Sequence, residues 1–378
     1  MTPFVITLLD AVAKGGSVPE HTTVDEIEAN RAIQVGLGPI LHDMALRVPG
    51  LISRESASAL LVSELAARAH YKRVSSTAAA VLEACASSVE GVVLLKGISV
   101  ADEYYPRPYW RPMGDIDILV AKEDLDLAES ALKDLGYRQA SPNPTDYYQT
   151  HHHSMPFLDP SNGIIVEIHT ALFPPQSPYS HCPIFQLPKV TTHLRLSERQ
   201  GKPVYRLSSE LELLYLSCHA LAEWRIFKSL VPFLDITLLL TKMGGKLDWD
   251  TLGDWLRDHR ASACLCVMLS YLDKYRVVAV PPEIQTAISA AKRRRGRLAL
   301  RILHNAIDRH VIGGHSIDDF PGQHNRYLLW DTLMTDRHPM LNLLWVPWNL
   351  AFPPSQPDRF RTAFHMARLR SALKSKKQ

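Results

Sequence analysis

The sequence has few cysteines, no long apolar run and no strong excess of one charge sign. Its five cysteines are scattered and odd in number, so neither a disulfide framework nor a zinc site is indicated. No apolar run reaches the roughly 18 residues that a membrane-spanning helix needs. The first segment, MTPFVITLLDAVAKGG, lacks the basic start and the cleavage pattern of a signal peptide, and we therefore expect a cytoplasmic protein.

The charges nearly cancel, with 42 lysines and arginines against 39 acidic residues. This balance argues against a broad basic surface of the kind that holds a nucleic acid. Positive charge gathers in two segments, at residues 292–297 and 359–377. The second segment contains no acid. It is either a solvated tail, which we favour, or a contact for an anionic membrane, an acidic partner or a nucleic acid.

Two apolar runs of strand length lie close together in the chain, at residues 92–95 and 116–120. Asp115 and Asp117 flank the first residue of the second run. Residues two apart on a strand share a face, so both carboxylates are expected to point the same way. Neighbouring carboxylates repel unless a cation lies between them, and oxygen ligands at this spacing suit Mg²⁺ or Mn²⁺ with a phosphate substrate. The alternative is a surface strand with two solvated acids. If the pair does repel, replacing either aspartate by asparagine should leave the fold intact or stabilise it.

A further acid, Glu167, lies in an extended run at residues 164–169. The sequence PSNG at 160–163 is a hairpin turn signal, so this run is predicted to be the second strand of a hairpin. If it pairs beside the strand of Asp115 and Asp117, Glu167 completes a cluster of three carboxylates. Such a cluster can hold two divalent ions for in-line displacement at phosphorus.

Two positions beside these acids suit a phosphate. Gly97 follows the first run, where the missing side chain lets a phosphate approach the backbone, and Lys96 can neutralise its charge. Between the runs, residues 104–110 are rich in tyrosine and tryptophan, which either cap the core or stack a base or sugar. Arg111 is predicted either to contact a phosphate or to form a structural salt bridge to one of the acids.

These residues fall in three short motifs, LLKG at 94–97, RPMGDIDILV at 111–120 and VEIHT at 166–170. Together the motifs resemble the uncharacterised nucleotidyltransferase family of bacteria, a branch of the DNA polymerase β-like nucleotidyltransferase superfamily. The resemblance implies three catalytic metal ligands, Asp115, Asp117 and Glu167. It also implies four nucleotide-binding residues, Lys96, Gly97, Ser99 and Arg111. The usual Gly-Ser or Gly-Gly pair is Gly-Ile here, so Ser99 comes one place late.

The resemblance further implies a fold and an activity. The expected fold is an α/β (α+β) nucleotidyltransferase core with a small mixed sheet, flanked by N- and C-terminal helical regions. The expected reaction is the Mg²⁺- or Mn²⁺-dependent transfer of a nucleotidyl group from an NTP to an acceptor hydroxyl or phosphate. Members of the family occur beside clusters for ribosomally made peptides, including lasso peptides. The expected acceptor is therefore a peptide, natural product or other small molecule, with nucleic acid less favoured.

Other functions remain open on the same fold. The chain could transfer a phosphoryl or glycosyl group, hydrolyse a phosphate ester, or serve as a non-catalytic scaffold or toxin-partner protein. Retention of three mutually repelling carboxylates argues against the scaffold, because an inactive site has no physical reason to keep them.

Three residues are candidates for the acceptor side. His169 lies two residues after Glu167 and should share its face. His219 and Asp235 match a histidine and an aspartate that recur in the family's C-terminal helical region. They either order the helices, which we favour, or line the acceptor side of the cleft. The three histidines at 151–153 should alternate across a strand, and we predict a polar edge strand there.

Hydrophobic periodicity and turn signals divide the chain into five parts. They are an N-terminal helical region at 1–74, a nucleotidyltransferase-like catalytic core at 75–175, a loop-rich linker at 176–207, a C-terminal helical domain at 208–290 and a basic helical extension with a tail at 291–378. A helix at 75–86 leads into the first strand and is expected to pack beneath the sheet.

Overall fold

The computed structural model describes residues 4–15, 23–141, 147–148, 151–175, 177, 179–222, 229–255, 259–278, 282, 284–286, 288–289 and 297–314. The basic segment at 292–296 and the predicted tail at 359–377 lie outside these residues. Of the predicted basic extension, the structure describes α13 (Arg297–Ile307) and the π-helical turn η6 (Asp308–Ile312). No helix among the described residues combines the length and the apolar composition that a bilayer span requires.

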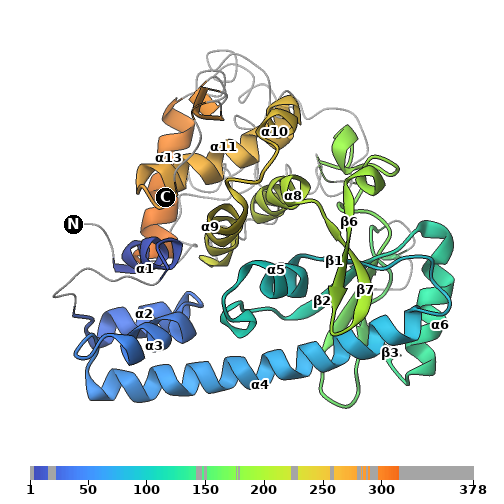
Figure 1. The fold of residues 1–378 in the computed structure, drawn as a ribbon, viewed down its shortest axis with the longest axis horizontal. Coiled ribbons are helices and arrows are strands. Elements are labelled where there is room, and N and C mark those ends of the chain that lie inside the picture. The colour runs from blue at the N-terminus through green and yellow to red at the C-terminus, as the bar shows by residue number, and fades with distance from the viewer. Residues whose placement is uncertain are drawn as a thin grey trace, which may run out of the picture.

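Four helices precede the sheet, and the last of them, α4, runs beneath it (Figure 1). They are α1 (Phe4–Ala13), α2 (Glu26–Gln34), α3 (Gly38–Arg47) and α4 (Arg54–Cys85). Asp25 caps α2 and Ser53 caps α4, each through a side-chain oxygen. The 32-residue α4 runs from α2 and α3 to the sheet, where Val74, Ala78 and Val81 enter its core. The predicted helix beneath the sheet is confirmed, and it continues unbroken across the predicted boundary at residue 74.

The described strands form one seven-stranded mixed sheet in the order β3-β4-β5-β2-β1-β7-β6. They are β1 (Val93–Leu95), β2 (Asp115–Leu119), β3 (Arg138–Gln139), β4 (Phe157–Leu158), β5 (Ile165–His169), β6 (Leu194–Arg199) and β7 (Lys202–Leu207). β2 pairs antiparallel with β1 and parallel with β5. This register places Asp117 between Leu95 and Glu167. The expected mixed sheet and the expected pairing of the two acid-bearing strands are confirmed.

Side-chain alternation along β2 separates an apolar face from the face that carries the acids. Ile116 and Ile118 are buried against α4 and α6 (Leu125–Asp134). Leu119 lies in the other core cluster, with residues of α8 (Ser209–Ala222) and α9 (Val231–Met243). Asp115, Asp117 and Leu119 occupy alternate positions of β2, so their side chains lie on the same face of the sheet. The sheet therefore buries both faces and presents its acids to the C-terminal helices.

The described residues form further helical elements. They are α5 (Lys96–Tyr104), η1 (Pro108–Trp110), η2 (Lys122–Asp124), η3 (Pro183–Phe185), η4 (Val190–His193), α10 (Trp249–Trp255) and α11 (His259–Lys274). α5 follows β1 directly and contacts both β2 and α9 (Figure 1). The expected α/β core with helical regions on both sides is confirmed.

The predicted linker at 176–207 is wrong for its second half. β6 and β7 form a hairpin there, and β7 pairs in parallel with β1. Gln200 and Gly201 at the turn have φ angles of +52° and +77°, the left-handed conformation that tight hairpin turns favour. Pro203, one of the residues that suggested a loop, lies in β7 before the part that pairs with β1, so no ladder bond to β1 is lost.

Candidate active site

The acids predicted from the sequence lie together on adjacent strands. Asp117 on β2 is in register with Glu167 on β5, and Asp115 lies two residues earlier on the same face. Carboxylate oxygens of Asp117 and Glu167 and a ring nitrogen of His169 lie within 4.8 Å of one another. Donor atoms this close can share one metal ion.

Asp117 is buried against Lys96 and His169. Its Oδ1 lies 2.9 Å from Nε2 of His169 and 3.1 Å from Nζ of Lys96. Burial alone would raise the pKa of the Asp117 carboxyl, but the Lys96 charge and the His169 hydrogen bond outweigh it, and the pKa lies well below its usual range. Asp117 is therefore ionised, as a metal ligand must be.

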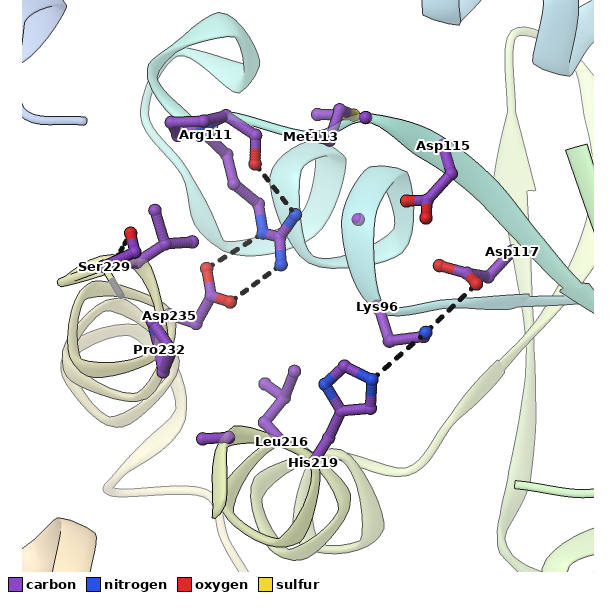
Figure 2. A pocket seen from close by; sticks show the side chains of 15 residues that line it. Lys96, Arg111, Met113, Asp115, Asp117, Leu216, His219, Ser229, Pro232 and Asp235 are labelled. Carbon is purple, nitrogen blue, oxygen red and sulfur yellow. Dashed lines mark hydrogen bonds and ion pairs between the residues drawn. The ribbon is translucent and has the colours of Figure 1, made fainter. Parts of the chain in front are cut away.

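Lys96, the first residue of α5, follows β1 directly and has a left-handed φ of +37°. This conformation costs a residue with a side chain about 1–3 kcal/mol, so surrounding contacts must hold it. The contacts are Asp117 on the sheet and His219 on α8, whose Nε2 lies 3.2 Å from Nζ of Lys96. This backbone conformation thus directs the lysine into the space between the sheet and α8 (Figure 2).

His169 connects the acids of the two strands. Its Nε2 is 2.9 Å from Asp117 and 3.6 Å from Oε2 of Glu167. Burial would lower the pKa of His169, but the hydrogen bond to Asp117 and the interaction with Glu167 outweigh it, and the net shift is upward. Burial would raise the pKa of Glu167, but the interaction with His169 outweighs it, and the net shift is downward. The expectation that His169 shares the face of Glu167 is confirmed.

A cavity of about 490 Å³ opens in front of Asp115 and Asp117, and Glu167 is not among the residues that line it (Figure 2). The predicted residues that line it from the sheet side are Lys96, Gly97, Asp115 and Asp117. From the helical side come His219 and Asp235. A Cβ added to Gly97 would lie 3.5 Å from the closest atom around it, an ordinary contact. Packing within the protein therefore does not require glycine here, and the missing side chain leaves the start of α5 open to a ligand.

Arg111 forms a buried, bidentate ion pair with Asp235 on α9. Both nitrogen–oxygen distances are 2.9 Å, and the hydroxyl of Tyr105 donates to the same carboxylate at 2.6 Å. Of the two roles predicted for Arg111, a salt bridge is present, but its partner lies on α9 instead of β2. The pair ties the segment before β2 to the helical wall of the cavity (Figure 2).

Ser99 does not line this cavity. It is buried on α5, where its hydroxyl accepts a hydrogen bond from Nη1 of Arg206 on β7 at 3.0 Å. Each residue turns a helix by about 100°, so the one-place delay after Gly97 points the hydroxyl in another direction. The structure therefore separates Ser99 from the other three residues that the resemblance assigns to the nucleotide.

The three histidines at 151–153 do not alternate across a strand, so the predicted edge strand is wrong. Only His153 forms a β-bridge, with His169, and the rings of the run lie together instead. Nε2 of His153 lies 4.0 Å from Oε2 of Glu167. Burial and the neighbouring imidazoles lower the pKa of His152. Sequence reasoning missed this cluster, although the run itself was a signal for it.

One family model matches the chain over residues 29–276, under the description uncharacterised nucleotidyltransferase. The chain belongs to this family. Membership assigns this nucleotidyltransferase to the transferases, and its mixed sheet with helical flanks agrees with that class. The matched range includes all the described strands and every cavity residue named above. No curated protein and no solved structure matches the chain.

Proposed function

We propose that this nucleotidyltransferase uses Mg²⁺ or Mn²⁺ to transfer a nucleotidyl group from an NTP to a hydroxyl or phosphate of an acceptor. The observation that carries the proposal is the register of β2 and β5. It sets Glu167 beside Asp117, which lines the cavity together with Asp115. In-line displacement at phosphorus needs carboxylates gathered in this way.

The acids fit a hard divalent cation. Asp117 and Glu167 offer carboxylate oxygens within 4.8 Å of each other and of His169, and oxygen donors are those that Mg²⁺ and Mn²⁺ prefer. We propose Asp115, Asp117 and Glu167 as the ligands. Bound there, the ion would lower the pKa of the attacking hydroxyl and neutralise charge on the phosphates. His169 is buried behind Asp117, so its proposed role is to orient that carboxylate.

Lys96 and Gly97 are proposed to receive the phosphates. Nζ of Lys96 lies between Asp117 and His219, and a phosphate in the cavity would compete for this ammonium. The N–H groups at the start of α5 add partial positive charge beside Gly97. The fork of Arg111 is already engaged, so its proposed role is to hold the cavity wall.

The acceptor is proposed to enter from the helical side, past His219 and Asp235 and opposite the acids. A peptide or natural product is the proposed class, because the nearly balanced charge of the chain does not provide a polynucleotide surface. Because NTPs are supplied in the cytoplasm, the proposal agrees with the location expected from the sequence.

The test is transfer of label from each NTP, carrying it at either the α- or the γ-phosphate, to candidate peptides and RNAs in the presence of Mg²⁺. Nucleotidyl transfer predicts α-label on the acceptor, release of pyrophosphate, and loss of both in Asp115→Asn. Label from the γ-phosphate on the acceptor would indicate a phosphoryl transferase. Phosphate release without a labelled acceptor would indicate a phosphoesterase, and no turnover with any substrate would favour a scaffold.

Salt separates the acceptor classes in the same assay. Affinity for an RNA should fall steeply as salt rises, through release of counterions from its backbone. Affinity for a peptide or small molecule should change little.

A further inference from the structure

Three imidazole rings gather beside the carboxylates, although their residues are consecutive in the chain. The ring centroids of His151, His152 and His153 lie 4.2 Å, 4.3 Å and 4.9 Å from one another. One nitrogen from each ring lies within 4.8 Å of the others. Consecutive residues of a regular strand could not achieve this, since their side chains point to opposite faces.

The backbone holds this segment against β5. The carbonyl oxygen of His152 accepts hydrogen bonds from the N–H groups of Thr170 at 2.8 Å and Ala171 at 3.3 Å. The N–H of Ser154 donates to the carbonyl of Ile168 at 2.9 Å. Main-chain hydrogen bonds therefore fix the segment that carries the rings. This lowers the entropy cost of ordering the rings around a ligand.

Two of the nitrogens lie close to the separation expected around a transition ion. The Nδ1 atoms of His151 and His152 are 3.0 Å apart. Two imidazole nitrogens bound to one tetrahedral zinc ion at about 2.0–2.1 Å are about 3.3–3.4 Å apart, so a small outward movement of the two rings would suit an ion. Nδ1 of His153 lies 2.7 Å from the carbonyl oxygen of Ser154, which can only accept a hydrogen bond. The neutral ring of His153 therefore carries its proton on Nδ1 and has a lone pair on Nε2, the arrangement by which carbonyls orient ligating histidines.

The donor chemistry separates this cluster from the acids. Imidazole nitrogens suit Zn²⁺, Ni²⁺ and Cu²⁺, whereas carboxylates suit Mg²⁺ and Mn²⁺. Three protein nitrogens also leave one position of a four-coordinate ion for water or a substrate oxygen. Glu167, 4.0 Å from Nε2 of His153, places a negative charge next to the cluster.

We propose that His151, His152 and His153 bind a single borderline transition ion, with Zn²⁺ as the expected occupant, at a site distinct from the carboxylate centre. The ion would fix this segment against β5 and keep one coordination position at the edge of the candidate active site. The proposal rests on the histidine geometry and stands whether or not the transfer reaction is correct.

The test uses Co²⁺ as a coloured probe for nitrogen ligation. The full-length chain without an affinity tag is titrated with Co²⁺ in millimolar Mg²⁺, and the visible absorption bands are recorded. We expect one Co²⁺ per chain, displaced by an equivalent of Zn²⁺ and retained in excess Mg²⁺. His151→Ala and His152→Ala should each weaken Co²⁺ binding by at least about tenfold. His181→Ala, at an exposed histidine elsewhere, and Asp115→Asn should bind Co²⁺ as the wild type does.

Circular dichroism in chelator first establishes that each variant is folded. The ring of His151 stacks on the exposed Tyr147 at a centroid distance of 4.8 Å, so His151→Ala is expected to fold and to carry the test alone if His152→Ala does not. Unchanged Co²⁺ affinity in folded His151→Ala would overturn the proposal. Displacement of Co²⁺ by Mg²⁺ would overturn it equally, because it would place the ion on the acids.

Discussion

Replacing Asp117 by asparagine should destabilise the fold, whereas the same change at Asp115 should not. The sequence alone predicts relief of repulsion at both positions. In the structure, however, Asp117 lies 3.1 Å from Nζ of Lys96 and 2.9 Å from Nε2 of His169. Asparagine keeps the shape of the side chain but removes its charge, so the buried Lys96 ammonium loses its counter-charge.

The magnitude follows from the burial of the pair. The side chains of Lys96 and Asp117 are 9% and 2% exposed. Removing one partner of a buried ion pair costs about 3–5 kcal/mol, because the remaining charge is uncompensated. The asparagine oxygen can still accept one hydrogen bond, so we expect the lower end, about 3 kcal/mol, for Asp117→Asn. Asp115 is only partly buried, and its replacement should change the free energy of unfolding by less than about 1 kcal/mol.

Urea unfolding in chelator, followed by circular dichroism, measures both variants against the wild type. The midpoint should fall clearly for Asp117→Asn and stay near the wild-type value for Asp115→Asn, while both variants lose label transfer. If Asp117→Asn is as stable as the wild type, the ion pair with Lys96 does not contribute as argued, and repulsion between the acids is the larger effect.

Further predictions concern the cavity and the helices around it. Gly97→Ala should leave the free energy of unfolding nearly unchanged, because the added methyl group makes only ordinary contacts. It should weaken the binding of NTP with Mg²⁺, measured by thermal shift, because the methyl group occupies space that a bound phosphate needs. Asp235→Asn should lower the free energy of unfolding by about 3–5 kcal/mol, because the largely buried Arg111 loses its counter-charge. Adding Arg111→Met should recover much of this loss, because it removes the unpaired charge. Burial raises the pKa of Glu212 from 4.5 to about 8, and its carboxylate oxygens have no hydrogen-bond partner among the described residues. A folded-state pKa above the unfolded value means that stability is lost as pH rises between the two, so Glu212→Gln should melt increasingly above the wild type from about pH 5 to about pH 8.

Matched controls make these predictions specific. Gly253→Ala, in open space on α10, should not alter nucleotide binding, and Glu123→Gln, at an exposed position, should melt in parallel with the wild type at every pH. Undiminished nucleotide binding in Gly97→Ala would contradict a phosphate at α5. A constant difference in melting temperature between Glu212→Gln and the wild type would show that Glu212 does not titrate in this range. An Asp235→Asn variant of wild-type stability would remove the structural role assigned to the ion pair.

The grouping of the three acids could be predicted because it depends on local rules. A two-residue period along the second strand puts Asp115 and Asp117 on one face, and the turn signal before Glu167 identifies the strand that carries it. Apolar residues at the alternate positions then determine which face is buried against α4 and α6. The register of β2 and β5 follows this pattern, since a slip of one residue would turn the acids into that core.

The rest depended on contacts between distant segments. Arg111 and Asp235 are 124 residues apart, and Lys96 and His219 are 123 apart, so only the packing of α8 and α9 over the sheet brings them together. Periodicity along one element carries no information about which partner an opposing helix supplies. The hairpin of β6 and β7 was missed although Gln200 and Gly201 at its turn are a local signal.

Mn²⁺ binding, followed by electron paramagnetic resonance with a non-hydrolysable NTP, tests most directly whether the acids hold a divalent ion that carries the nucleotide. One equivalent of Zn²⁺ per chain, added first, is used to occupy the proposed histidine site, and no excess is present to compete with Mn²⁺ at the acids. The side chain of Glu167 is 22% exposed, so Glu167→Gln is expected to fold normally. We predict that nucleotide tightens Mn²⁺ binding in the wild type and that Glu167→Gln binds Mn²⁺ at least about tenfold more weakly. Equal Mn²⁺ affinity in the wild type and in folded Glu167→Gln, with or without nucleotide, would contradict the metal centre.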